Sequence, residues 1–284
     1  MNRRDVRRRF DAAAAGFDGA DFVHRHAATG LFERLSPMVL DVERILDAGS
    51  ATGAASRYLA RSWRKSRVIS LDLSFSMLDA ARKNRSRFAR ISEVQADAQQ
   101  LPIGDGCIDL VFANMLLPWS IDAAGFLAEV RRVLRKDGVF AFSTFGPDSL
   151  REVREAWAEA DDDEHVNAFP DMHDIGDQAV RAGLRDPVLD VDYLTVTYRS
   201  SNALFRDLTA AGARNCLQRR RRTLTGKQRF ARMCEALDRN FRDGALPLRL
   251  ELVFGHAFGS GPVPAAGAGY EYRLDVRDIG RRRR

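Results

Sequence analysis

An acid followed by a run of small residues stands in the first quarter of the chain, in the stretch ILDAGSATG from Ile45 to Gly53. Asp47 closes a short apolar run, and only small residues separate Gly49 from Gly53. This spacing is neither the G-x-G-x-x-G of dinucleotide-binding loops nor the G-x-x-x-x-G-K-[ST] of phosphate-binding loops. A carboxylate at the mouth of such a loop repels phosphate groups. We therefore expect a ligand that carries positive charge and no phosphate.

Three further polar side chains end successive apolar runs, and each suits one part of an adenosine-containing ligand. Asp72 lies about twenty residues past the glycine loop, where a carboxylate can accept both hydrogen bonds of a ribose diol. Asp97 ends the next run and suits the exocyclic amine of adenine, and Asn114 ends the following run, beneath a methionine portion. S-adenosylmethionine (SAM), with its ammonium and sulfonium groups, fits all of these positions. The predicted cofactor-binding residues are Asp47, Gly49, Ser50, Gly53, Asp72, Leu73, Met77, Asp97, Ala98 and Asn114.

Bringing these side chains together requires a parallel sheet, because the carboxyl ends of parallel strands meet at one edge. Apolar or β-branched runs alternate with amphipathic stretches through the centre of the chain, which predicts an α/β fold with crossover helices. The stretch AAGFLAEVRRVLRKDG predicts a helix that ends at Gly138. The expected strands are Arg44–Ala48, Arg67–Asp72, Glu93–Ala96, Ile108–Asn114, Val139–Phe145, Asp190–Tyr198 and Leu248–His256.

Helical additions are expected outside this sheet. Residues 1–40 predict a basic helical arm that serves as a lid, and residues 201–246 predict a mostly helical insertion before the last strand. The central domain then spans residues 41–258. The stretch GSGPVPAAGAG opens a flexible linker and a basic tail over residues 259–284.

The 284 residues are 45% hydrophobic and 30% charged, which is typical of a globular protein with one sizeable α/β domain. No apolar run reaches the length of a membrane span, and no apolar segment follows the basic start MNRRDVRRRF, so we expect a cytoplasmic protein without a membrane partner. Cys107, Cys216 and Cys234 share no metal-ligand spacing and are expected to be buried thiols. No cluster of histidine, cysteine and aspartate predicts a metal site.

Positive charge is concentrated in three places of a chain whose net charge is +6: the first ten residues, Arg219–Arg222 and Arg281–Arg284. Such patches attract an anionic partner. Proteins that read RNA also carry interleaved aromatic residues, a GXXG clamp or zinc-ligand spacing, and this sequence shows none of these. We therefore do not expect nucleic acid to be the partner.

The glycine loop, LDLSFSML, ADAQQLP and RVLRKDGVFAFSTFG resemble the class I SAM-dependent methyltransferases over roughly Val42 to Tyr198. That resemblance implies a Rossmann-like, mostly parallel seven-stranded sheet with an antiparallel last strand and helices on both faces. The flanking stretches RRRFDAAAAGFD, FSTFGPDSLREVREAW and DLTAAGARNCLQRRRRTLTG resemble the malonyl-acyl-carrier-protein O-methyltransferases of biotin synthesis. Three positions depart from that pattern: Ala51 replaces a usual glycine, Phe17 a common tyrosine, and Pro118 a usual histidine.

This resemblance implies that a carboxylate oxygen of a malonyl thioester attacks the methyl group of the sulfonium. A carboxylate is already ionised at neutral pH and needs no general base, so no catalytic residue is assigned. An acidic acyl-carrier protein would explain the basic runs, and Arg199 and Arg214 are candidates for holding the substrate carboxylate. The histidines interpreted as structural or exposed are His24, His26, His165, His173 and His256.

Two other functions stay open at the level of the sequence. The stretches FGPDSLREVR and HDIGDQAVRAGL are similar to segments of the mitochondrial complex I assembly factor that hydroxylates an arginine, itself a methyltransferase-like protein. The basic composition alone also allows an RNA-associated methyltransferase. The sequence determines neither the oligomeric state nor whether the acyl group is carried by a protein or by coenzyme A.

Overall fold

The computed structural model describes residues 1–218, 220, 223 and 225–261. The predicted linker and basic tail lie almost entirely outside the described residues. Arg219, Arg221 and Arg222 of the second basic run also lie outside them.

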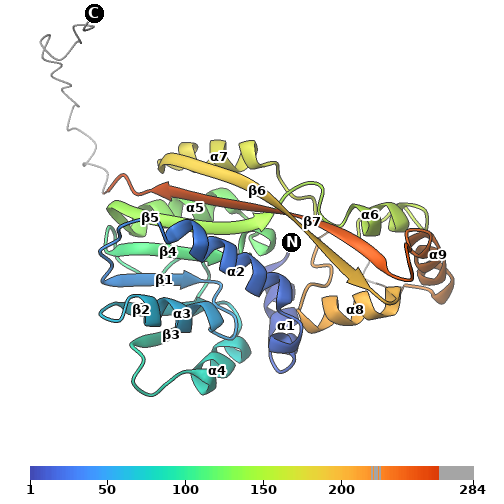
Figure 1. The fold of residues 1–284 in the computed structure, drawn as a ribbon, viewed down its shortest axis with the longest axis horizontal. Helices are drawn as coiled ribbons and strands as arrows, with labels where there is room; N and C mark the ends of the chain where they lie inside the picture. Colours follow the sequence, from blue (N-terminus) through green and yellow to red (C-terminus); the bar gives the residue numbers. More distant parts are fainter. Residues whose placement is uncertain (219, 221–222, 224, 262–284) are drawn as a thin grey trace, which may run out of the picture.

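Seven strands form one sheet in the order β3-β2-β1-β4-β5-β7-β6 (Figure 1). The first five strands in this order pair in parallel, and β7 pairs antiparallel with both β5 and β6. This arrangement confirms the predicted fold class. The strands are β1 Arg44–Ala48, β2 Arg67–Asp72, β3 Ile91–Gln95, β4 Ile108–Asn114, β5 Leu134–Phe145, β6 Arg185–Tyr198 and β7 Leu246–Phe258.

Helices cover both faces of the sheet, as the alternation of patterns predicts. In β4, Leu110 and Phe112 face one core with Leu31 of α2, while Val111 faces a second core with Phe126 of α5. A strand buried on both sides is apolar at nearly every position, which is why β4 reads as a continuous apolar run. The helices next to the sheet are α2 Phe22–Leu35, α3 Ala54–Ser62, α4 Phe75–Asn84, α5 Ala123–Val133 and α7 Met172–Arg181.

A two-stranded ribbon extends the sheet beyond the other strands (Figure 1). Within β7, only Leu252–Phe258 pair with β5, whereas β6 pairs with β7 along its whole length. Three helices pack on this ribbon around a separate apolar core that includes Trp157, Met233 and Leu248. They are α6 Arg151–Ala158, α8 Ser201–Ala210 and α9 Lys227–Asp238, of which the last two form the predicted insertion.

The N-terminal arm divides into two parts with different roles. α2 is part of the sheet's helical cover, whereas α1, Arg3–Ala13, lies beside α4 at the carboxyl edge of the sheet (Figure 1). A short 3-10 turn, Phe17–Gly19, joins the two. Phe17 and Met77 are buried together between α1 and α4, and Asp11 accepts a hydrogen bond of 2.6 Å from Ser74 Oγ. The arm is therefore packed onto the sheet edge.

Several predicted boundaries are wrong: β3, β5, β6 and β7 differ from their predicted bounds, and the largest error concerns the helix before β5. The helix expected to continue to Gly138 ends at Val133, and β5 begins at Leu134, which pairs with Ile108. The last carbonyls of the helix are bound from outside it, because Cys107 N donates to Val133 O at 2.9 Å. Gly138 lies inside the strand, where an added Cβ would come within 3.0 Å of Ile108 O. This glycine therefore allows a close approach of two strands and does not end a helix.

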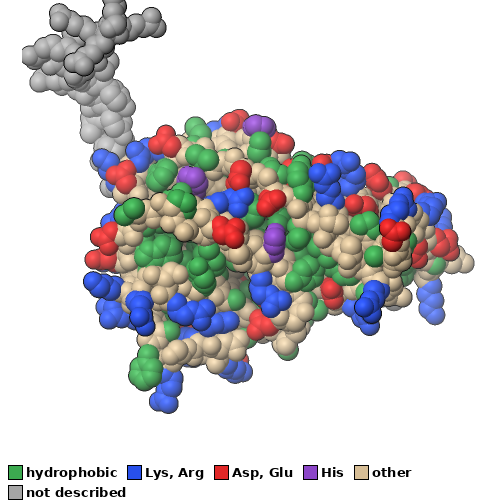
Figure 2. Space-filling view, in the orientation of Figure 1, with side chains coloured by type: hydrophobic (Ala, Val, Ile, Leu, Met, Phe, Trp, Pro, Cys, Tyr) green, Lys and Arg blue, Asp and Glu red, His purple; other side chains and the backbone are tan. Residues whose placement is uncertain are grey.

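Acidic and basic side chains are interspersed on the surface. Figure 2 shows arginine and lysine side chains along the lower edge and at the far end of the ribbon, with acidic side chains among them. Of the helices that the structure describes, none is both long and apolar enough to cross a membrane.

Candidate active site

The glycine loop owes its small residues to its backbone conformation. Gly49, Ala51 and Gly53 have φ angles of 75°, 47° and 77°, in the left-handed region that favours glycine. The amides of Gly49 and Ser50 both donate to Leu71 O, at 2.8 and 3.0 Å, which attaches the loop to β2. An alanine in this region costs on the order of 1 kcal/mol, so the methyl group of Ala51 is tolerated at a modest price.

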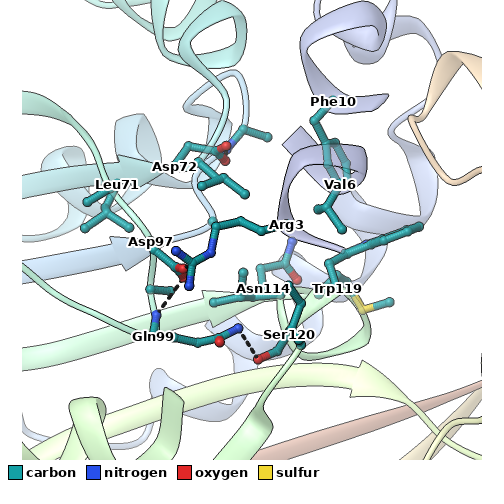
Figure 3. A pocket seen from close by; sticks show the side chains of 18 of the residues that line it. Arg3, Val6, Phe10, Leu71, Asp72, Asp97, Gln99, Asn114, Trp119 and Ser120 are labelled. Carbon is teal, nitrogen blue, oxygen red and sulfur yellow. Dashed lines mark hydrogen bonds and ion pairs between the residues drawn. The ribbon is translucent and has the colours of Figure 1, made fainter. Parts of the chain in front are cut away.

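Asp72 is held at the carboxyl end of β2 by two backbone amides. Its Oδ2 accepts from Ala51 N at 2.9 Å, and its Oδ1 accepts from Ser74 N at 2.8 Å. Burial raises the pKa of Asp72 to about 6, although these amides favour its charged form. Each carboxylate oxygen keeps a further lone pair beside the cavity that Asp72 lines (Figure 3).

That cavity, the edge cavity, has a volume of about 90 Å³ and lies between the sheet edge and α1. Asp97 lies across it from Asp72 and forms an ion pair of 2.6 Å with Arg3 Nε (Figure 3). Small-molecule sites usually measure about 300–1,000 Å³. Arg3 and the start of α1 must therefore shift before an adenosine can enter. The predicted residues that line the edge cavity are Gly49, Asp72, Leu73, Asp97, Ala98 and Asn114.

Asn114 is less available to a ligand than predicted. Its Nδ2 donates to His24 O at 2.9 Å, and its Oδ1 accepts from Ser143 Oγ at 2.8 Å. The side chain thus links α2 to β4 and β5 while it lines the edge cavity.

Asp47 and Ser50 line an adjoining space, the loop cavity, of about 620 Å³. Asp47 is 1% exposed and accepts a hydrogen bond of 2.5 Å from Ser56 Oγ. Burial, aided by the nearby charge of Asp72, raises the pKa of Asp47 to about 7. Among the described residues it has no ion-pair partner, so a cationic ligand would relieve an otherwise costly buried acid.

Two predicted residues line neither cavity. Gly53 caps α3, and a Cβ at this position would come within 2.9 Å of Ala81 Cβ. Met77 is fully buried beneath α1. Both residues lie in or next to the glycine loop without lining its cavities, and their contact with a cofactor remains a prediction.

A third space, the aromatic cavity, has a volume of about 600 Å³ and lies between α2, the ribbon and its three helices. Its walls are mainly aromatic and aliphatic, and Phe145, Phe169 and Phe205 are among them. It shares three residues with the edge cavity: His24, Met115 and Trp119. Two compartments that meet at a few residues suit a transfer between two ligands.

Sequence reasoning missed the residues at this meeting point. His24 is one of the histidines interpreted above as structural or exposed, and the sequence assigns no role to Trp119. Arg3 and Phe10, which wall the edge cavity from α1, were predicted only as parts of a lid. Phe10 contacts Trp119 edge to face, with the ring centroids 5.2 Å apart. No local pattern marks these residues, because they come together only through tertiary contacts.

Asp161, Asp163 and His165 form a polar cluster next to the aromatic cavity, which their spacing did not predict. Their possible ligand atoms lie within 4.8 Å of one another. His165 Nε2 lies 2.7 Å from Asp161 Oδ1, and its ring stacks on Trp157 with centroids 3.6 Å apart. Asp161 also lies 3.8 Å from Arg229 of α9. These contacts explain the cluster as a structural link between the loop that follows α6 and helix α9.

Asp47 and Asp72 predict a pH dependence of cofactor binding. Below about pH 6, Asp72 and Asp47 are protonated in the free protein, so a cationic ligand gains little from them. We expect the affinity for SAM, measured by calorimetry, to rise between about pH 5 and about pH 8.

The stability of the ligand-free protein should change with pH in the opposite direction. Because folding raises both pKa values, its free energy of unfolding should fall as pH rises from 3.8, the ordinary pKa of an aspartate, towards about 7. An affinity that does not change over this range would contradict the prediction.

Comparison with known proteins gives one consistent result. A protein-family model described as "Methyltransferase domain" matches residues 46–142. The chain is 42% identical to the malonyl-[acyl-carrier protein] O-methyltransferase of Halorhodospira halophila, over 100% of this chain and 97% of the relative. It is 38% identical to the protein of the same name from Gallionella capsiferriformans, over 92% of each chain. The crystal structure of the YcgJ protein from Bacillus subtilis matches 82% of this chain and 98% of its own, with a TM-score of 0.58 and 16% identity.

Proposed function

The chain belongs to the malonyl-[acyl-carrier protein] O-methyltransferases, and from this membership we infer that it methylates the free carboxylate of a malonyl thioester in biotin synthesis. The observation that carries this function is the similarity over the full length, including the arm and the insertion that enclose the two compartments. The cofactor is SAM, which supplies an electrophilic methyl group on a sulfonium.

The residues at the sheet edge suit this cofactor. Asp72, oriented by two amides, would accept hydrogen bonds from a ribose diol. Asp47, a buried acid without a cationic partner among the described residues, would favour the ammonium group. No general base is required, because a carboxylate is already ionised at neutral pH. The chain therefore contributes alignment of the two ligands and exclusion of water.

The acyl group is proposed to be carried by an acidic carrier protein. Arg4, Arg7 and Arg8 are exposed on α1, at helical spacings that place them on one side. Arg214 is exposed and lines the aromatic cavity. Arg199 lines neither compartment and is a weaker candidate for a role in substrate binding. The three exposed arginines of α1, together with Arg214, would pair with carboxylates of the carrier and guide its thioester into the aromatic cavity.

A methyl-transfer assay with labelled SAM tests the function. We expect malonyl-carrier protein to accept the label and acetyl-carrier protein, which lacks the nucleophilic carboxylate, to remain unlabelled. Malonyl-coenzyme A in the same assay separates recognition of the thioester from recognition of the carrier. The expected order of rates is malonyl-carrier protein, then malonyl-coenzyme A, with no transfer to the acetyl carrier.

Two results would contradict this function. A protein that binds SAM but labels none of the malonyl substrates would favour the hydroxylase-like alternative. Salt-dependent retention on RNA, together with labelling of RNA but not of the thioesters, would favour the RNA-associated alternative.

A further inference from the structure

His24, near the start of α2, occupies a unique position among the described residues that line these spaces. It lines the edge cavity, the loop cavity and the aromatic cavity, whereas Met115 and Trp119 line only two of the three. The acids predicted to bind the cofactor lie in the edge and loop cavities, and the proposed acyl site is the aromatic cavity. The imidazole therefore stands where the two ligands have to meet.

The ring of His24 packs beside an aromatic ring and has an unsatisfied polar atom. Its Nδ1 is buried and has no hydrogen-bond partner. Its backbone carbonyl accepts the bond from Asn114 Nδ2, and its ring lies 5.1 Å from the ring of Phe17. A buried nitrogen without a partner is costly, so such groups are uncommon and call for an explanation. Because this atom has almost no accessible surface, the ring must rotate before a ligand that accepts a hydrogen bond can supply one.

The environment also determines the charge of the imidazole. Burial lowers the pKa of His24 to about 4, so the ring is neutral at physiological pH. A neutral imidazole donates from one nitrogen and accepts at the other. It therefore offers a single N–H donor without the full positive charge of an arginine. Of the described residues that line the aromatic cavity, Arg214 carries a permanent positive charge, but it is exposed and does not line the edge cavity.

We propose that His24 binds the substrate carboxylate by donating the Nδ1 hydrogen to one of its oxygens, which leaves the other oxygen free to attack the methyl group. This proposal rests on the function proposed above. The attacking oxygen forms the new O–C bond as the S–C bond breaks, the electron pair of that bond stays on sulfur, and no proton moves. A neutral donor orients the carboxylate and satisfies part of its hydrogen-bonding capacity, yet withdraws less charge from the nucleophile than an ion pair would.

In this role His24 favours binding of the free acid over binding of its methyl ester. Once the carboxylate is methylated, its negative charge is lost and the charge-assisted hydrogen bond becomes an ordinary one. The methyl ester should therefore bind more weakly than the acid, which helps release of the product. The discrimination between acid and ester should depend on His24.

The test compares three variants in the full-length protein. His24→Leu removes the donor but keeps an apolar side chain, and His24→Asn places an amide N–H near the position of Nδ1. His26→Leu changes an exposed histidine two positions further along the same helix, and serves as the matched control. The measurements are kcat/KM for malonyl-carrier protein, competition by malonyl-carrier protein and by its methyl ester, and calorimetric affinity for S-adenosylhomocysteine.

We expect His24→Leu to lower kcat/KM by roughly 10- to 100-fold and to bind acid and ester equally well, with cofactor affinity within about twofold of wild type. His24→Asn should recover part of both the rate and the discrimination, and His26→Leu should match wild type. The proposal is overturned if His24→Leu retains full rate and discrimination, if the Asn variant is no better than the Leu variant, or if cofactor affinity falls in parallel with the rate. A wild-type protein that methylates no malonyl thioester contradicts the proposed function itself, which distinguishes that failure from these.

Discussion

Asp72→Ala is expected to weaken SAM binding by about 2–4 kcal/mol, the value of a pair of charge-assisted hydrogen bonds. This corresponds to a loss of roughly 30- to 1,000-fold in affinity. The reason is the geometry of the carboxylate, which two amides hold at the end of β2 beside the edge cavity. Calorimetric titration with SAM and with its demethylated product measures the effect.

Two further variants show whether the effect belongs to the ligand. Asp79→Ala removes a half-buried acid of α4 that pairs with Lys83, and should leave the affinity unchanged. Asp72→Asn keeps the shape of the side chain but loses its charge, and should fall between wild type and Asp72→Ala. If Asp72→Ala binds SAM as tightly as wild type does, the assignment of the edge cavity to the cofactor is wrong.

Deletion of residues 1–20 is expected to reduce methyl transfer by at least about 100-fold, because small losses of alignment at a reacting centre have effects of this size. The deletion removes Val6, Phe10 and Phe17 from the walls of the edge cavity and opens the meeting point at Trp119 to water. Cofactor affinity should fall less than the rate, because Asp47 and Asp72 stay in place. Rates with malonyl-carrier protein and calorimetric affinities for SAM test both parts.

Point variants on α1 control for a general loss of structure. Phe10→Ala removes the edge-to-face contact with Trp119 and should lower the rate partially. Arg4→Ala changes an exposed side chain of the same helix and should leave the rate with malonyl-coenzyme A unchanged, since that substrate has no carrier protein to bind. A truncated protein that methylates as fast as the full chain would show that α1 does not enclose the site.

The strands were predictable where their residues alone carry the signal. β1, β2 and β4 begin and end at the residues expected from the sequence, because strands buried on both faces are mostly apolar and stand out from the polar stretches around them. The end of α5 was not predictable in this way. The amphipathic pattern continues past Val133, but pairing of Leu134 with Ile108 favours a strand there. A contact between residues far apart in the chain outweighs a local preference of a few tenths of a kcal/mol per residue.

The sequence by itself determined the fold class and the family, and it predicted a cationic, adenosine-containing cofactor at the carboxyl edge of the sheet. These conclusions depend on short stretches such as the glycine loop and on the order of Asp72 and Asp97 at strand ends, which a linear reading can follow. Only the tertiary structure decided that Arg3 pairs with Asp97 across the edge cavity, and that Asn114 is bound to the backbone of His24. It also placed His24 where the three cavities meet. Burial and an unpaired nitrogen depend on which segments pack around a residue, and no spacing within one segment records them.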